Sequence, residues 1–299
     1  MKIKGILLMI LMPFSWLTAQ NLQPYIVGIE TTETVAAIGE KVKANLALNE
    51  LKLVGSYQPA NDKNRMVIVF SSVELENAVK KTGGLTGFAA ALRIGITSEN
   101  GKTIVSYTNP SYWGNAYFRN DFNLVAPLYA NLTKHIENAM KATGSFAGKP
   151  FGSKKGLPVK DLQKYHYMLG MPYFDEPVEL GSFSNYSAAL AKIEASVKKG
   201  IPNVKMVYKV PIASKELTLY GFALSGDKGE GQFMPVIDIN NPKHTAFLPY
   251  EVLVMGNKVL MLHGRYRIAL SFPDLTMGTF SKIMSTPGNI EDLLKQLTK

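Results

Sequence analysis

The spacing of apolar and polar residues over positions 25–46 predicts a strand followed by a helix. A strand is predicted over residues 25–29, and cap-type residues follow at 31–34. Apolar residues then recur at intervals of three and four, which is the spacing of an amphipathic helix. These apolar positions are Val35, Ile38, Val42 and Leu46.

The same pattern returns in the second half of the chain. A strand is predicted over residues 178–183, with Ser184 and Asn185 as the cap. The helix predicted after it has the same apolar spacing of three, four and four, at Tyr186, Ala189, Ile193 and Val197. The two halves of the chain therefore begin alike.

The agreement continues through the segments that follow. Each half offers an apolar segment, a proline and a second strand, namely 51–54, Pro59 and 66–70, then 204–207, Pro211 and 217–222. Each half then has a hairpin signal around a turn that contains Asn and Gly. The hairpins are 92–96 with 103–107, and 250–254 with 259–263. Helical sequence closes the halves at 124–141, and at 277–283 and 290–297.

This order of elements predicts an α+β fold of two tandem β-α-β-β-(α)-β-β-α units. Each unit should form an antiparallel sheet with helices on one face, and the units should be related by a pseudo-twofold axis. The predicted domains are a first repeat at 21–143, a linker with a connecting helix at 144–175, and a second repeat at 176–299. The agreement between the halves suggests that the chain arose by an ancient duplication. Chance similarity between two α+β units is the alternative.

The start of each half and one hairpin together resemble a bacterial family, domain of unknown function 302 (DUF302). The hairpin stretch is Leu248-Pro249-Tyr250-Glu251-Val252-Leu253-Val254, with its glycine turn, and the likeness covers most of residues 23–140 and 176–297. The resemblance implies this strand order and association in pairs, so two copies in one chain would mimic a dimer. Family members often carry a cysteine where this chain has Tyr250, and the first copy has Ala90-Ala91 there. A thiol-dependent role is therefore not carried over, and the family has no established activity.

Residues 1–20 are predicted to be a cleavable secretory signal peptide. Lys2 and Lys4 precede an apolar run at 6–17, and Thr18-Ala19-Gln20 offers a small-residue cleavage site. The run is shorter than the roughly 20 residues that span a bilayer as a helix, although an uncleaved anchor is the alternative. We therefore expect a periplasmic or secreted protein with no membrane segment after cleavage.

Composition narrows the classes of site that the chain can contain. It has no cysteine, so a lipoprotein anchor, a disulfide framework and a zinc-thiolate site are all excluded. The net charge is +10, and removal of Lys2 and Lys4 leaves +8. The basic residues are scattered and the protein is expected to be exported, so nucleic acid is not expected as a partner. A solvated basic surface is expected instead, with attraction to anionic lipid or polysaccharide as the alternative.

Motifs for common chemistries are missing. The four histidines, at 135, 166, 244 and 263, form no HxH or HExxH pair, so a metal site would need assembly over long range. No G-x-S-x-G or Walker motif occurs, and the glycine-rich segment 226–231 is interpreted as a solvated connection. The sequence predicts no catalytic residue, no metal site and no cofactor.

One dense group of cationic residues suggests a ligand site. If residues 259–270 form a strand, His263, Arg265 and Arg267 share one face and could hold a small anion. Tyr250, Trp113 and Tyr107 are aromatic residues with polar groups that could line the same pocket. A solvated sheet face and ordinary packing between the two halves are the alternatives.

Three functions fit these features. The first is a non-catalytic module of the cell envelope that binds an envelope protein or a small ligand, for which an anion is one candidate. The second is a hydrolase or lyase that acts on a small anionic or glycan substrate, and the third is a structural subunit of an envelope assembly. The expected pseudo-dimer within one chain is compatible with a monomer.

Overall fold

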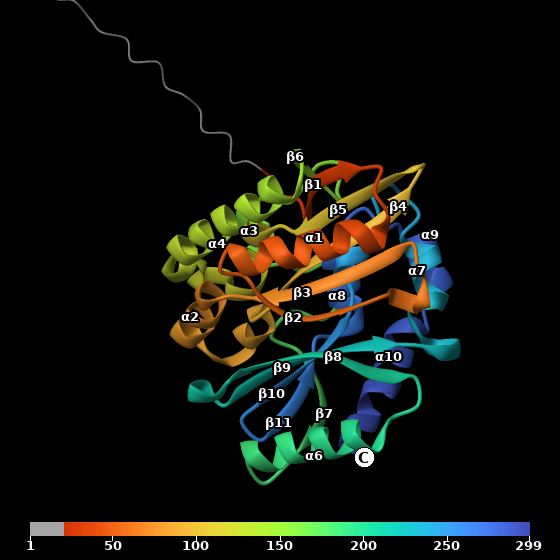
Figure 1. The fold of residues 1–299 in the computed structure, drawn as a ribbon. Coiled ribbons are helices and arrows are strands. Elements are labelled where there is room, and N and C mark those ends of the chain that lie inside the picture. The colour runs from red at the N-terminus through yellow and green to blue at the C-terminus, as the bar shows by residue number, and fades with distance from the viewer. Residues whose placement is uncertain (1–20) are drawn as a thin grey trace, which may run out of the picture.

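A computed structural model describes residues 21–299 of the chain. The predicted signal peptide at residues 1–20 lies outside this described part. The described residues form an α+β fold with two antiparallel sheets, as the sequence predicted (Figure 1). No helix within residues 21–299 is long and apolar enough to cross a membrane.

The first sheet has six strands in the order β2-β3-β4-β5-β1-β6. The strands are β1 (Tyr25–Thr31), β2 (Lys52–Tyr57), β3 (Arg65–Ser71), β4 (Leu92–Glu99), β5 (Lys102–Thr108) and β6 (Phe146–Phe151). Its helices are α1 (Val35–Leu48), α2 (Val73–Thr82), α3 (Pro110–Phe118) and α4 (Phe122–Thr143). The helix predicted from apolar spacing is confirmed as α1, because Val35, Ile38, Val42 and Leu46 are all buried and Thr34 caps it by accepting from the Ala37 N–H.

The second sheet has five strands in the order β7-β11-β10-β9-β8. They are β7 (Val178–Ser182), β8 (Val204–Ile212), β9 (Leu217–Leu224), β10 (Tyr250–Met255) and β11 (Lys258–Met261). The accompanying helices are α6 (Tyr186–Lys199), α7 (Glu230–Ile237), α8 (Gly264–Ser271), α9 (Met277–Phe280) and α10 (Thr286–Lys295). Helix α6 packs on β10 and β11 and begins at the predicted cap, Asn185.

The shared strands have the same order in the two sheets. Strands β2-β3-β4-β5-β1 of the first sheet correspond, in chain order, to β8-β9-β10-β11-β7 of the second. The registers agree as well, because Leu92 pairs with Phe70 as Tyr250 pairs with Phe222. The next residues, Arg93 and Glu251, therefore occupy matching positions in their sheets.

The predicted linker contains one element that the sequence analysis did not identify. Residues 146–151 form β6, which pairs with β1 at the edge of the first sheet. Gly148 and Pro150 are unusual in strands, so this segment carries no strand signal in the sequence. An edge position tolerates a proline because one side of the strand needs no ladder hydrogen bonds. The helix predicted over residues 159–168 corresponds to the shorter helix α5 (Val159–Gln163).

The strand predicted at residues 259–270 is wrong beyond Met261. Helix α8 begins at Gly264, and the His263 side chain caps it by accepting a hydrogen bond from the Arg265 N–H at 3.2 Å. Most of its residues are buried around the whole circumference, so the segment has no amphipathic pattern that would indicate a helix. The premise that three cationic side chains share one strand face is therefore contradicted.

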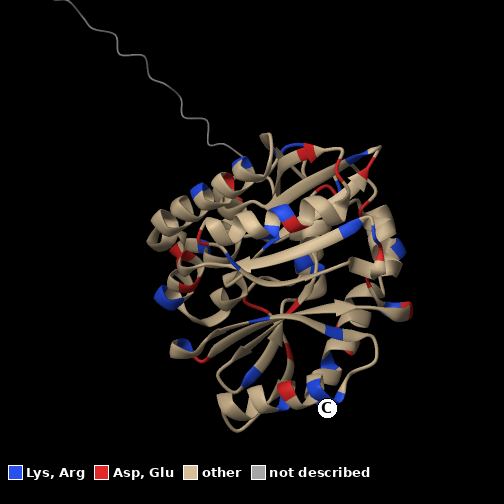
Figure 2. Cartoon of the chain, in the orientation of Figure 1, with Lys and Arg blue, Asp and Glu red and all other residues tan. Residues whose placement is uncertain are grey.

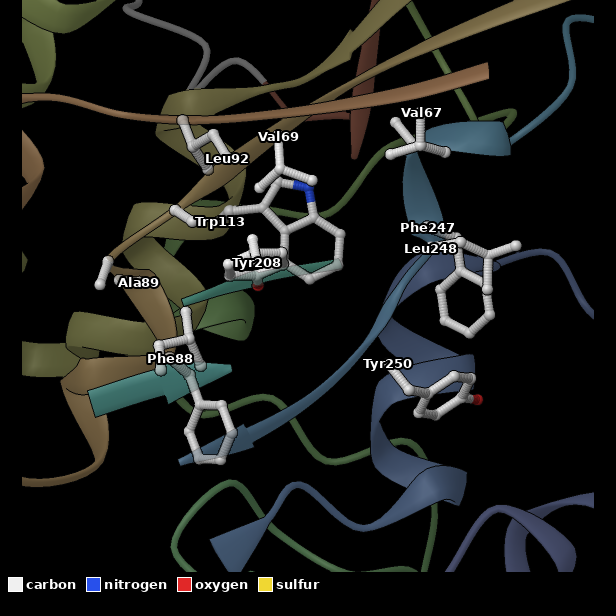
Figure 3. Packing of buried hydrophobic residues seen from close by; sticks show 14 of the residues in the cluster. Val67, Val69, Phe88, Ala89, Leu92, Trp113, Tyr208, Phe247, Leu248 and Tyr250 are labelled. Atoms are coloured by element: carbon white, nitrogen blue, oxygen red, sulfur yellow. The ribbon is translucent and has the colours of Figure 1, made fainter. Parts of the chain in front are cut away.

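The two sheets meet through a common hydrophobic core. Gly55 of β2 lies against the backbone of β8, where an added Cβ would come within 2.4 Å of the Val207 carbonyl oxygen. Residues 84–89 of the first half pack on β9 and β10, while residues 245–247 of the second half pack on β3, β4 and β5. Side chains from both halves fill the core, including Val69 and Trp113 from one and Tyr208 and Tyr250 from the other (Figure 3).

Candidate functional site

Three of the six predicted ligand-binding residues lie in the core between the halves, namely Trp113, Tyr250 and Arg267. Trp113 of α3 is 2% exposed, and its indole N–H donates to the Pro24 carbonyl at 2.8 Å. Tyr250 of β10 is buried beside the guanidinium of Arg267, which lies 4.6 Å from its ring centroid. These side chains pack the two halves together and do not reach a surface where a ligand could bind.

Arg267 belongs to a buried charged group at the centre of the core. Arg93 donates to Glu251 Oε1 at 2.5 Å, and the Tyr208 hydroxyl donates to the same oxygen at 2.6 Å. Arg267 lies 3.5 Å from Glu251 Oε2 and donates to the carbonyls of Phe247 and Pro249. Both arginines and the glutamate are at most 2% exposed. Buried charges in proteins are usually paired in this way. The Arg267 guanidinium therefore makes its contacts inside the protein and does not face a ligand.

The other predicted residues are separate from this group and from one another. His263 is half-buried at the cap of α8, and burial, together with the neighbouring Arg265, lowers its pKa. Arg265 lines a cavity of only about 10 Å³, which is too small for an organic ligand. Tyr107 of β5 is 1% exposed, and burial raises the pKa of its hydroxyl. The structure thus does not gather the six residues into one pocket.

A larger cleft opens elsewhere, between the edge of the first sheet and loops of the second half. Its volume is about 600 Å³, within the range of small-molecule sites. One wall is β6 with the turn after it, and the other is formed by the loops that follow α7 and α8. Among its lining residues are Phe151, Lys154, Asn240, Asn241, His244 and Thr276.

His244 is the most distinctive residue of the cleft wall. Its ring stacks on Phe272, with centroids 4.6 Å apart, and lies 4.8 Å from the ring of Tyr25. Its Nδ1 is 3.0 Å from the Ser271 carbonyl oxygen, which can only accept a hydrogen bond. Nδ1 must therefore carry the proton, and Nε2 has no hydrogen-bond partner within the described chain. Burial lowers the pKa of His244, which favours the neutral ring with a lone pair on Nε2.

Two sets of polar contacts hold the walls of the cleft together. The Asp274 carboxylate accepts from the Ser153 hydroxyl at 3.1 Å and from the Lys154 N–H at 2.7 Å. Asp238 accepts from the His244 N–H at 2.8 Å and from Arg65 at 2.9 Å, so a residue of β3 fixes a loop of the second half. Both sets of contacts join segments that are far apart in the sequence, and they give the cleft a defined shape.

The chemistry of the cleft is mainly neutral. Apolar surface comes from Phe151, Phe272, Ile237, Ile239 and Leu275, and uncharged hydrogen-bonding groups come from Gln23, Asn240, Asn241, Thr276 and Thr279. Lys154 and Asp274 contribute one charge of each sign. On the face in view, basic and acidic residues are interspersed, without a large patch of either sign (Figure 2).

Sequence reasoning missed this cleft because its residues come from four distant segments. His244 follows a loop and has no second histidine, carboxylate motif or nucleophile at a recognisable spacing. The turn Gly152–Ser153 falls within the predicted linker at 144–175, which contains none of the predicted site residues. One available signal was the run Asn240-Asn241-Pro242-Lys243-His244, a polar loop with a single histidine between apolar segments.

No family model matches the chain, and no curated protein matches it. Among solved structures, an uncharacterised conserved protein described as DUF302 from Bacillus stearothermophilus is similar, at 12% identity and a TM-score of 0.35. The similarity covers 40% of this chain and 98% of that one, which corresponds to one copy of such a protein. The chain is thus similar over part of its length to an uncharacterised DUF302 protein.

Proposed function

We propose that this chain is an exported cell-envelope protein that binds a small polar ligand in the cleft lined by His244. The observation that carries the proposal is the cleft itself, about 600 Å³ in volume, with an unpartnered imidazole nitrogen among neutral hydrogen-bonding groups. Ligand sites commonly combine apolar walls with a few polar groups that fix orientation. Export rests on the signal-peptide pattern of residues 1–20.

We also propose that the two halves are tandem DUF302-like copies related by a pseudo-twofold axis. The common strand order supports this, as do the matching registers of Arg93 and Glu251. Asn109 and His263 add to the support, because each follows the hairpin of its half and caps the next helix with its side chain. The pairing of Arg93 with Glu251 places two corresponding residues in contact, as expected for residues next to such an axis.

The composition of the cleft favours a ligand with hydroxyl or amide groups and an apolar face, such as a sugar. The aromatic and aliphatic side chains of the cleft would cover the apolar face of such a ligand, while Asn240 and Thr276 would exchange hydrogen bonds with its polar groups. Among the described residues that line the cleft, Lys154 is the one with a cationic side chain. An anionic ligand would depend on Lys154, whereas a neutral ligand would not.

A hydrolase or lyase that uses the same cleft is the second candidate. The observation that favours it is the fixed tautomer of His244, which leaves Nε2 as a base. A binding protein would release its ligand unchanged, whereas an enzyme would release a product. Mass spectrometry of each ligand after incubation with the protein separates the two candidates.

The proposal is tested by calorimetry of the full mature chain. The probes are glucose, N-acetylglucosamine, glucose 6-phosphate and glucuronate, each titrated into wild type, Asn240→Ala and Lys154→Gln. We expect at least one probe to bind, and Asn240→Ala to weaken binding about fivefold, as loss of a hydrogen bond of about 1 kcal/mol would. Lys154→Gln should weaken the two anionic probes and leave the neutral ones unchanged.

Asn123→Ala is the matched control, because Asn123 is an exposed asparagine on α4, away from the cleft lining. It should bind every probe as the wild type does. Absence of binding for all four probes, or binding that survives both cleft substitutions, would contradict the proposal.

A further inference from the structure

We propose a binding site for a divalent transition-metal ion, best suited to Zn²⁺, formed by Glu50, Glu74 and His135 in the helical layer of the first half. One potential ligand atom from each residue lies within 4.8 Å of the other two. The site is separate from the cleft, and none of the three residues lines it. The proposal is therefore independent of the proposed function.

Three different elements supply the ligands. Glu50 follows the C-terminal end of α1, Glu74 lies in the first turn of α2, and His135 lies in the middle of α4. Helix α4 packs against both α1 and α2, so the fold brings the three residues together at this junction. A metal ion bound here would join all three helices.

The side chains of Glu74 and His135 approach each other without forming a hydrogen bond. His135 Nδ1 lies 3.6 Å from Glu74 Oε1, too far for a hydrogen bond. Two ligands at about 2.1 Å from a tetrahedral zinc ion would be about 3.4 Å apart. The observed separation is close to this value, and small side-chain rotations would complete the geometry.

Two polar atoms of the group are buried without any partner in the described chain. They are Glu74 Oε2 and His135 Nδ1, and neither makes a hydrogen bond. Leaving such atoms unsatisfied costs roughly 1–3 kcal/mol each, so most buried polar groups in proteins have a partner. A bound ion would coordinate these atoms and remove the cost.

The charge of the group favours a divalent cation. Neither Glu50 nor Glu74 pairs with a lysine or arginine within residues 21–299, which leaves two carboxylates beside one imidazole. Mg²⁺ and Ca²⁺ prefer oxygen ligands only, whereas an imidazole with carboxylates suits Zn²⁺. Glu50 is exposed, so water can occupy the fourth position.

Titration of the metal-free mature chain with ZnCl2 tests the site. We expect one equivalent of Zn²⁺ to bind, and affinity to fall at least about tenfold in His135→Gln and in Glu74→Gln. At a concentration about 100-fold above Kd, Zn²⁺ should raise the Tm of the wild type by roughly 5 °C and that of the variants much less. MgCl2 should give neither effect.

His166→Gln is the matched control, because His166 lies outside the group, and its affinity for Zn²⁺ should match that of the wild type. Unchanged Tm values in EDTA show that each variant folds. If either variant is unfolded, the wild type is tested with Co²⁺ instead. Bound Co²⁺ should absorb visible light, and one equivalent of Zn²⁺ should displace it and abolish this absorption. No Zn²⁺ binding, or stoichiometric binding retained by both folded variants, overturns the proposal.

Discussion

Glu230 shows how a single residue can change its chemistry when the fold buries it. Glu230 is the first residue of α7 and lies in the glycine-rich segment 226–231. This segment was predicted to be a solvated connection. The structure instead leaves the Glu230 side chain 1% exposed, where its Oε1 accepts from the Tyr57 hydroxyl at 2.9 Å and the Leu224 N–H at 3.2 Å. Burial raises the pKa of Glu230 to about 7, although these hydrogen bonds oppose the shift.

This shift predicts that Glu230 makes the protein less stable as pH rises. Because the folded pKa lies above the ordinary value of 4.5, the folded state keeps a proton that the unfolded chain has lost. Stability should therefore fall between about pH 4.5 and pH 7, by up to about 3 kcal/mol from this residue. In Glu230→Gln the amide oxygen can still accept both hydrogen bonds, so urea unfolding at pH 5 and pH 8 should show a smaller difference than in the wild type.

The control for Glu230 is Glu40→Gln, a substitution of a carboxylate whose side chain is 73% exposed. It should keep the pH dependence of the wild type. Equal pH dependence in the wild type and Glu230→Gln would contradict the burial of a protonated carboxyl group.

Helices α1 and α6 show what the pattern of apolar residues could and could not predict. Apolar spacing together with cap residues indicated both helices, and Ile38 and Ile193 are at most 1% exposed, as a core-facing stripe requires. Helices α3 and α8 gave no such signal, because nearly all of their residues are buried and the polar face is missing. Periodicity thus indicated α1 and α6, which each have a solvent face, and failed for α3 and α8, which are enclosed by the two halves.

Truncation of the core isoleucines tests this interpretation of α1 and α6. Ile38→Ala and Ile193→Ala should each lower the free energy of unfolding by roughly 2–4 kcal/mol, because each leaves a cavity in a packed core. Leu48→Ala, at a position that is 80% exposed, should change it by less than about 0.5 kcal/mol. Urea denaturation measures all three, and a cost near zero for either isoleucine would place its helix face in solvent.

At the scale of the whole molecule, the sequence predicted the α+β class and both sheets but not the sites. The order of strands and helices along the chain follows from local patterns and turn residues, which a sequence displays directly. The cleft depends on how β6 and the loop at His244 meet, and the proposed metal site depends on three helices packing together. Contacts between distant segments produce no periodic pattern in the sequence. His263, Arg265 and Arg267 were predicted as a site only because they lie close together along the chain.

The prediction of export concerns the whole chain and can be checked directly. The mature protein purified from its native host should begin at Gln20 or Asn21, where the apolar run gives way to polar residues. N-terminal sequencing or intact-mass measurement gives the answer. Soluble periplasmic protein that retains Met1 would rule out cleavage.

Strand β6 has a consequence for stoichiometry. Within the described part of the chain it has no counterpart in the second sheet, which has five strands where the first has six. Since β6 and the turn after it form one wall of the cleft, the other end of the molecule cannot build the same cleft. Two identical subunits would carry two equivalent clefts, whereas residues 21–299 form this cleft once. A saturating ligand should therefore bind at one molecule per chain, with a simple hyperbolic isotherm and no cooperativity between copies.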